Sequence, residues 1–164
     1  MIISIPKETS QNETRVSCTP SSVKDLIKSG FEVQVETKAG LNSFILDSDY
    51  ESVGAKIVSD YKEIFKNADI ILKVTPPTKE EIKLLKEGAI YISFFQTTRQ
   101  LQEVKDLTDK NITGFSMHLI PRTTLAQKMD ALSSQANIAG YKSVLMAATR
   151  LGVYMPLLMT AAGT

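Results

Sequence analysis

The stretch Ile70-Ile71-Leu72-Lys73-Val74-Thr75-Pro76-Pro77-Thr78-Lys79-Glu80-Glu81 decides the fold. Its first five residues form a nearly continuous apolar run, which predicts a strand covered on both faces of a parallel sheet. Pro76-Pro77 ends that strand, and the spacing of Thr78 and Glu81 is that of a capping box, which begins a helix. Lys73 interrupts a run that should be buried, and a buried charge needs a partner.

The same order of strand, turn and helix recurs on both sides of this stretch. We expect further strands at residues 2–5, 31–35, 55–58, 90–93 and 112–117. We expect helices at residues 20–29, 47–53 and 101–107, and a long helical region from about residue 124 to residue 150. Gly30, Gly54, Gly88 and Gly152 stand where the respective helices should stop.

Alternating strands and helices with short connections imply parallel strands and right-handed crossovers. The predicted fold class is therefore α/β: a doubly wound, mostly parallel sheet with helices on both faces, flavodoxin-like or Rossmann-like, followed by a long C-terminal helix. The corresponding domain organisation is an α/β domain at 1–123, a helix at 124–152 and an apolar connecting tail at 153–164.

The composition of the 164 residues excludes several classes of protein. With 43% hydrophobic and 23% charged residues and a net charge of +1, the chain resembles a folded soluble protein without the basic face that nucleic acid requires. The single Cys18 and the single His118 argue against a disulfide framework and against a metal site. No apolar run approaches the roughly 20 residues of a membrane span.

Ligands of doubly wound sheets bind beyond the carboxyl ends of the strands. Three cations are expected at this edge: Arg15 after the first strand, Lys73 at the end of the fourth and Arg122 after the sixth. Their convergence suggests a site for an anionic or strongly polar small molecule. The alternative is that each is an ordinary solvated loop charge.

The segment from Pro121 to Tyr141 carries the strongest pattern. Helical spacing predicts one apolar stripe of Leu125, Met129, Leu132, Ala136 and Ala139. It predicts a second stripe of short polar groups, which suggests a contacted surface: Gln127, Asp130, Ser134, Asn137 and Tyr141. In the alternative interpretation Gln127 closes a capping box with Thr124, Asp130 favours the helix dipole, and the small residues allow a tight helix crossing.

This segment closely resembles a signature of the NAD(H)-binding alpha subunit of proton-translocating NAD(P) transhydrogenase. The shared pattern is Pro-Arg, a spacer, Ala-Gln, and then Asp-x-Leu-Ser-Ser-Gln-x-Asn-Ile-Ala-Gly-Tyr, here ending at Tyr141. The resemblance extends over essentially the whole chain, through Ile5-Pro6-Lys7-Glu8, Asn12-Glu13-Thr14-Arg15-Val16, Ile71-Leu72-Lys73-Val74 and Thr160-Ala161-Ala162-Gly163.

The resemblance implies roles for individual residues. The residues that surround the nicotinamide and its ribose correspond here to Arg122, Gln127, Asp130 and Ser133. Of these, Gln127 and Asp130 are the implied catalytic residues. The implied reaction is direct hydride transfer from NADH to NADP⁺ held by a separate component, for which the cofactors supply the reactive groups. The implied partners are a second copy of the subunit, the NADP(H)-binding component and a membrane-embedded proton channel. The implied location is peripheral, on the cytoplasmic or matrix face of an inner membrane.

The related alanine dehydrogenases share Arg15 and Lys73, which there grip a substrate carboxylate. These enzymes also place a catalytic histidine after the fifth strand, where this chain has Ser93-Phe94-Phe95-Gln96. The absence of that general acid/base makes an alanine dehydrogenase-like activity the second hypothesis. A non-catalytic α/β interaction module is the third. His118 lies elsewhere, and for it we expect a neutral structural role.

No G-x-G-x-x-G dinucleotide motif occurs in the sequence. In the resembled subunit it follows the Ala-Ala-Gly segment, close to Thr164, so the chain is expected to be the N-terminal part of that subunit. We therefore expect NADH to bind the chain weakly or not at all. The apolar segment Val153-Tyr154-Met155-Pro156-Leu157-Leu158-Met159 suggests contact with a further domain or a second copy, or simple burial.

Overall fold

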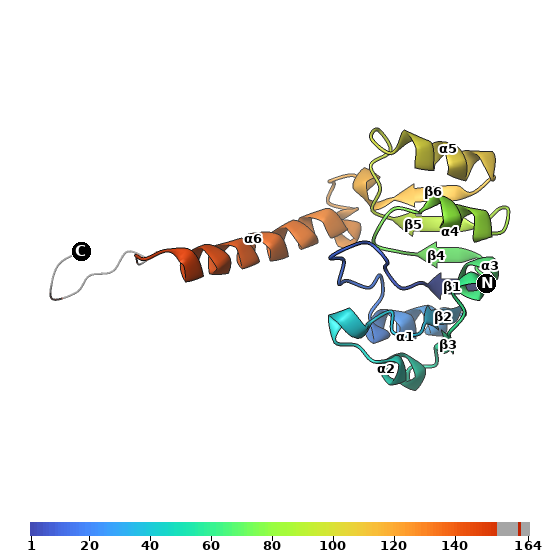
Figure 1. Ribbon diagram of the computed structural model, residues 1–164, viewed down its shortest axis with the longest axis horizontal. Coiled ribbons are helices and arrows are strands. Elements are labelled where there is room, and N and C mark those ends of the chain that lie inside the picture. Colours follow the sequence, from blue (N-terminus) through green and yellow to red (C-terminus); the bar gives the residue numbers. More distant parts are fainter. Residues whose placement is uncertain (154–160, 162–164) are drawn as a thin grey trace. The chain divides into compact units, whose positions relative to one another are not determined.

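The computed structural model describes residues 1–153 and 161, and it divides the chain into two compact units, residues 1–119 and 120–164 (Figure 1). The first unit contains the sheet and its helices, and the second contains the long helix. The predicted tail at 153–164 lies outside the described residues, apart from Val153 and Ala161.

The first unit is built on a six-stranded parallel sheet with the order β3-β2-β1-β4-β5-β6. Its strands are β1 (Ile2–Ile5), β2 (Glu32–Glu36), β3 (Lys56–Val58), β4 (Ile70–Leu72), β5 (Ile90–Ser93) and β6 (Thr113–Ser116). Strand order reverses between β1 and β4, the topological switch point of a doubly wound sheet. The predicted fold class is confirmed.

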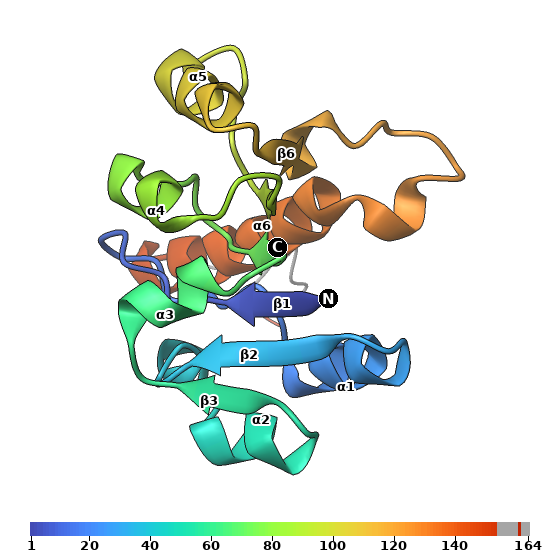
Figure 2. The ribbon, with the colours of Figure 1, turned by 90° about the vertical axis from the view of Figure 1, so that its right-hand side faces the viewer.

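Helices cover both faces of this sheet. They are α1 (Pro20–Lys28), α2 (Asp47–Ser52), α3 (Tyr61–Lys66), α4 (Lys79–Leu84) and α5 (Leu101–Asp109), with short 3-10 turns η1 (Leu41–Ser43) and η2 (Met117–Leu119). Figure 2 shows α3, α4 and α5 on one side of the stacked strands and α1 on the other. The core is accordingly split in two. One cluster joins α1 and α2 to β1 and β2, and the other joins α3, α4 and α5 to β4 and β5.

Local sequence signals explain most helix boundaries. The Thr19 side chain accepts a hydrogen bond from the Ser22 N–H and caps α1, which Gly30 ends with φ +90°. The predicted capping box of Thr78 and Glu81 is confirmed at α4. The sequence prediction missed α3, although Asp60 caps it by accepting from the N–H groups of Lys62 and Glu63.

Strand β4 is shorter than predicted, because it ends at Leu72 where residues 70–74 were expected. The reason lies in the next backbone groups. The Lys73 N–H still bonds Ile92 of β5, but the Val74 N–H donates to the Glu8 carboxylate at 2.6 Å instead of continuing a ladder toward β1. A side chain therefore replaces a strand partner at this point.

The second unit corrects the predicted helix start at Thr124. A 3-10 turn, η3 (Gln127–Met129), comes first, and the helix α6 runs from Ala131 to Arg150. Asp130 separates them because its backbone, with φ −76° and ψ 78°, leaves the helical region. Hence Leu125, Gln127 and Met129 are not on the helix that was expected to carry them. The two predicted stripes are therefore interrupted before Ala131, where α6 begins.

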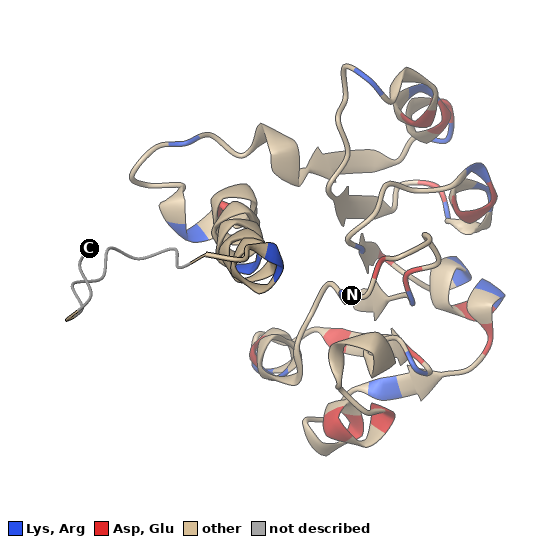
Figure 3. Cartoon of the chain, turned by 60° about the vertical axis from the view of Figure 1, so that its left-hand side comes forward, with Lys and Arg blue, Asp and Glu red and all other residues tan. Residues whose placement is uncertain are grey.

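Helix α6 has no buried residue and bears only two charged side chains, Lys142 and Arg150, so it is largely uncharged in Figure 3. Apolar side chains that are about half exposed or more lie along it: Ile138, Tyr141, Val144, Leu145 and Met146. Within residues 1–153 no helix is long and apolar enough to cross a membrane.

Candidate functional site

Lys73 stands directly after β4, at the carboxyl edge of the sheet, and is almost completely buried. Its Nζ atom donates to Glu81 Oε1 at 2.6 Å and lies 3.7 Å from Glu8 Oε2. The exposed fraction of the Lys73 side chain is 0%, and the values for Glu81 and Glu8 are 0% and 3%. The sequence predicted a buried partner for Lys73, and the structure shows two, Glu81 and Glu8.

Both carboxylates are held by further hydrogen bonds. Glu81 Oε2 accepts the Thr78 N–H at 2.9 Å, which is one half of the capping box of α4. Glu8 accepts the N–H groups of Val74 and Thr75 and the Thr75 hydroxyl. A buried charge cluster is stable only with such additional bonds. The cluster thereby ties three segments together: the loop after β1, the end of β4 and the start of α4.

Further buried polar atoms lie on the strands beside this cluster. The Tyr91 hydroxyl and the Ser93 Oγ of β5 have no hydrogen-bond partner among the described residues, and neither has the Ser4 Oγ of β1. Burial, together with the charges of Glu81 and Glu8, raises the pKa of Tyr91 well above its usual value, so the phenol stays protonated. The interior of the sheet at this edge is polar as well as charged.

Arg15 lies in the loop after β1 and makes an ion pair with Glu13. Its Nε and Nη2 atoms donate to the two carboxylate oxygens of Glu13 at 2.9 and 2.7 Å, the two-pronged arrangement typical of arginine. This contact is the main reason why the pKa of Glu13 is lowered. The charge of Glu8 also acts on Arg15. Of the predicted edge cations, Arg15 and Lys73 are thus both paired with carboxylates of their own unit.

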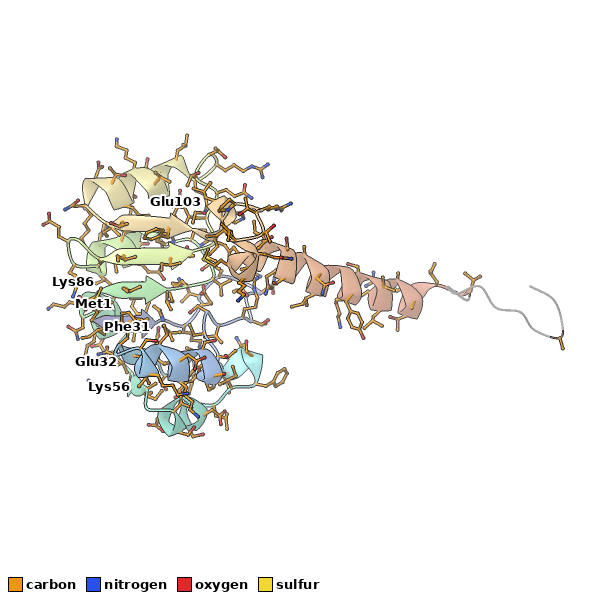
Figure 4. All side chains as sticks on the ribbon, turned by 180° about the vertical axis from the view of Figure 1, so that it is seen from behind. Met1, Phe31, Glu32, Lys56, Lys86 and Glu103 are labelled. Carbon is orange, nitrogen blue, oxygen red and sulfur yellow. The ribbon has the colours of Figure 1, made fainter. Side chains whose placement is uncertain are left out.

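The opposite, amino-terminal edge of the sheet has a different character. Figure 4 marks Met1, Glu32 and Lys56 there, at the beginnings of β1, β2 and β3. An exposed ion pair, Lys86 with Asp69 at 2.5 Å, stands at this edge and also holds the chain start, since Asp69 accepts the Ile2 N–H. These contacts are structural and involve no predicted site residue.

The second unit contains a cleft of about 340 Å³ lined entirely by polar side chains: Arg122, Thr123, Thr124, Gln127, Asp130 and Ser133. All four residues that the sequence motif singled out are among them. The chain brings them together because the irregular segment before α6 and the 3-10 turn of η3 fold against the first turn of the helix. A continuous helix from residue 124 would have spread Gln127, Asp130 and Ser133 along one face.

Asp130 is the most constrained member of this set. Its Oδ1 atom accepts the Ser133 N–H at 3.0 Å, and its Oδ2 atom accepts the Ser133 hydroxyl at 2.5 Å. These bonds, more than the positive charge of Arg122, lower the pKa of Asp130. The cleft therefore presents a carboxylate that stays ionised at neutral pH, beside a guanidinium.

The sequence of the chain matches one known protein family over most of its length. Residues 4–139 match the model of the family described as "Alanine dehydrogenase/PNT, N-terminal domain", which is well over half of the chain. The chain belongs to this family. The match covers the sheet unit from residue 4 onward and also the cleft residues 122–133.

Relatives of the alanine dehydrogenase/PNT family place the chain nearer to transhydrogenases than to dehydrogenases. NAD(P) transhydrogenase subunit alpha of Haemophilus influenzae is 43% identical over 99% of the chain and 31% of its own length. The solved transhydrogenase from Sinorhizobium meliloti is 42% identical, with a TM-score of 0.92 over 99% of the chain and 48% of its own. The alanine dehydrogenase of Methanococcus maripaludis is 36% identical over 92% of the chain and 40% of its own length.

The expected resemblance to the N-terminal part of the transhydrogenase alpha subunit is confirmed by these relatives. The chain spans about a third to a half of the length of the relatives it matches. In this family context the residues that sequence reasoning underrated are Glu8 and Glu81. Glu8 belongs to an N-terminal motif and Glu81 to a capping box. The sequence pattern, however, did not predict that both carboxylates contact Lys73.

His118 lies in η2, where its ring packs edge-on against Phe94 with 5.7 Å between centroids. Its Nδ1 atom is buried and has no hydrogen-bond partner among the described residues. No group of three or more potential metal ligands occurs among the described residues either.

Proposed function

We propose that the chain is part of the NAD(H)-binding component of an NAD(P) transhydrogenase, and that the cleft of its second unit holds the nicotinamide end of the dinucleotide. The observation that carries this proposal is the convergence of Arg122, Gln127, Asp130 and Ser133 on one cleft. The names of the Haemophilus influenzae and Sinorhizobium meliloti relatives support it.

The side chains of the cleft suit a nicotinamide. Its carboxamide carries an NH₂ donor and a carbonyl acceptor, and it needs both kinds of partner side by side. Asp130, when ionised, only accepts hydrogen bonds, whereas Arg122 only donates them. A volume of about 340 Å³ lies at the small end of the roughly 300–1,000 Å³ range of ligand pockets, which fits one end of a dinucleotide better than the whole.

The dinucleotide, when bound, would supply the chemistry, because a dihydronicotinamide ring is a hydride donor. The residues of the chain would bind and orient it. Arg122 would donate to the carboxamide oxygen and Asp130 would accept from its NH₂ group, while the Ser133 hydroxyl holds Asp130. Gln127, with both donor and acceptor atoms, would hold the ribose side and set the approach of the ring toward the acceptor. Orientation of this kind accounts for a large part of the rate of a hydride transfer.

The proposed assembly follows the resemblance to transhydrogenases. NADP(H) is held by a partner component, the NAD(H)-binding subunit pairs with a second copy, and the complex docks on a membrane-embedded, proton-translocating part. The chain itself is then peripheral, on the cytoplasmic or matrix face of an inner membrane. The exposed apolar side chains of α6, such as Tyr141 and Val144, supply a surface for such contacts.

The test uses a hybrid enzyme, in which this chain replaces the segment that it matches in the alpha subunit of the Haemophilus influenzae transhydrogenase. Hydride transfer from NADH to NADP⁺ is measured by stopped-flow spectroscopy in the assembled hybrid. Arg122→Ala and Gln127→Asn should each slow transfer by about 100-fold, the loss that mispositioning costs. Lys128→Ala is the matched control, because Lys128 lies in the same turn without lining the cleft.

Unchanged transfer rates in the Arg122 and Gln127 variants would refute the assigned roles. Oxidation of alanine by NAD⁺ in place of transhydrogenation would favour a dehydrogenase instead. Circular dichroism of each variant checks that α6 is still formed, so that a loss of rate reports on the site.

A further inference from the structure

The ammonium group of Lys73 is only partly bonded within the buried cluster. An ammonium has three N–H donors, yet among the described residues Nζ makes one hydrogen bond, to Glu81 Oε1 at 2.6 Å. Glu8 Oε2 lies 3.7 Å from Nζ, near enough to attract the charge but too far to accept a direct hydrogen bond. Because the exposed fraction of the Lys73 side chain is 0%, bulk water does not reach the remaining N–H groups.

Two buried hydroxyls lie on β5, the strand next to Lys73. The register of β4 and β5 pairs Ile71 with Tyr91. Two residues later the same register sets Lys73 beside Ser93. Side chains two residues apart point to the same face of a strand, so both hydroxyls are on the face that α4 covers, from which Glu81 bonds Lys73 (Figure 2). Within the part of the chain that the structure describes, neither hydroxyl has a hydrogen-bond partner.

The Tyr91 hydroxyl is also close to the carboxylates without bonding them directly. Burial is the main cause of its raised pKa, and the charges of Glu81 and Glu8 raise the pKa further. The phenol therefore keeps its proton and remains a hydrogen-bond donor. Polar groups that face one another beyond the range of a direct hydrogen bond are commonly joined by a water molecule.

We propose that Lys73, Tyr91 and Ser93 form an internal binding site for an ordered water molecule, at the junction of β4, β5 and α4. A buried water makes about three hydrogen bonds to polar groups that otherwise lack a partner, and the Lys73 ammonium and the two hydroxyls supply that number. Folded proteins bury roughly one water per 27 residues, so the sheet unit of residues 1–119 has room for about four.

The chemistry of the site selects a small neutral ligand. The ammonium of Lys73 repels a metal cation, and the carboxylates of Glu81 and Glu8 repel an anion. Water both donates and accepts hydrogen bonds, so it accepts from the ammonium and still pairs with either hydroxyl. The site involves no residue of the cleft in the second unit, and its test is therefore independent of the proposed function.

Tyr91→Phe distinguishes a water-bonded hydroxyl from an unpartnered one by the sign of its effect. With water bound, the substitution removes a hydrogen bond, and the folding equilibrium constant of the 164-residue chain should fall about fivefold in urea unfolding. If the hydroxyl has no partner, the substitution removes the cost of burying it and the constant rises. An unchanged or increased folding constant overturns the proposal.

Tyr50→Phe is the matched control. The exposed fractions of Tyr50 and Tyr91 are both 0%, and the Tyr50 hydroxyl donates directly to the Cys18 carbonyl at 2.7 Å. Its folding constant should fall at least as far as that of Tyr91→Phe. Ser93→Ala should lower the constant as well, and the double variant of Tyr91 and Ser93 should lose less than the product of the two single losses, because both hydroxyls hold the same water. Independent losses overturn the shared site.

Two measurements on the unsubstituted chain identify the ligand. A crystal structure should show a water within about 3.2 Å of Lys73 Nζ and of Tyr91 or Ser93, whereas direct bonds among these groups, with no water between them, overturn the site. Folding constants in sodium chloride, potassium chloride and sodium acetate at equal ionic strength should agree. A constant that depends on one of these ions assigns the site to that ion and overturns the proposal of water.

Discussion

Substitution of Lys73 by methionine should be the most damaging single change in the sheet unit. Methionine retains much of the length of the aliphatic stem, so the change removes the charge and leaves little cavity. What remains are the carboxylates of Glu81 and Glu8, whose side chains are only 0% and 3% exposed. Removing one partner of a buried ion pair costs about 3–5 kcal/mol, because the other charge stays buried without compensation.

The expected loss of stability is large compared with the free energy of unfolding of the whole domain. Domains of this size are stable by about 5–15 kcal/mol, so the expected loss is a large part of the total. With a urea dependence of about 2 kcal/mol per molar, the midpoint of unfolding should fall by roughly 2 M. Near-ultraviolet circular dichroism follows the sheet unit specifically, since the buried tyrosines Tyr50 and Tyr91 both belong to it.

Lys86→Met is the matched control, because it removes a lysine from an ion pair of similar length, 2.5 Å, whose side chains are 43% and 30% exposed. Exposed pairs contribute only about 0–1 kcal/mol, so its midpoint should hardly move. Adding Glu81→Gln to Lys73→Met removes one uncompensated buried charge and should restore at least about 1 kcal/mol of the free energy of unfolding. A loss below about 1 kcal/mol for Lys73→Met, or equal losses for the two lysine variants, would show that Lys73 does not compensate the buried carboxylates.

Two further predictions concern residues away from the sites. Burial raises the pKa of the Cys18 thiol to about 11. At pH 8 its alkylation by iodoacetamide should therefore be at least about 100-fold slower in the native chain than in urea, because the thiolate is the reactive form. Equal rates would show that the thiol is not buried. Asp60→Ala removes the side chain that caps α3 at the N–H groups of Lys62 and Glu63. It should lower the free energy of unfolding by about 1 kcal/mol, whereas Asp60→Asn should be nearly neutral. An equal loss in both variants would contradict the capping role of Asp60.

The order of the elements was predictable from the sequence, because apolar runs, capping residues and glycines mark it locally. The Thr19 and Thr78 caps and the glycine stops need only neighbours within a few residues. Helix α3 is no shorter than α2 and α4, which were predicted; it was missed because its cap at Asp60 follows β3 without a turn signal. The early end of β4 was not predictable, since it depends on Glu8, which is 66 residues away from Val74 in the sequence.

The cleft was predictable in its members but not in its shape. The motif named Arg122, Gln127, Asp130 and Ser133, yet helical spacing placed the last three on a continuous helix from about residue 124. Asp130 decides between the two arrangements, since as an N-cap it ends one segment and begins another. Sequence periodicity does not separate a polar residue inside a helix from one that starts it, because both occupy the same positions in the pattern.

The proposed binding site for the nicotinamide end of NAD(H) is the cleft of the second unit. Its most direct test is a titration of the ¹⁵N-labelled chain with NADH at millimolar concentrations, followed by NMR, which detects weak binding. Binding in that cleft should give shifts that saturate together at Arg122, Gln127, Asp130 and Ser133, all of which line it. Shifts confined to the neighbourhood of Arg15 and Lys73, with the cleft residues unmoved, would contradict it.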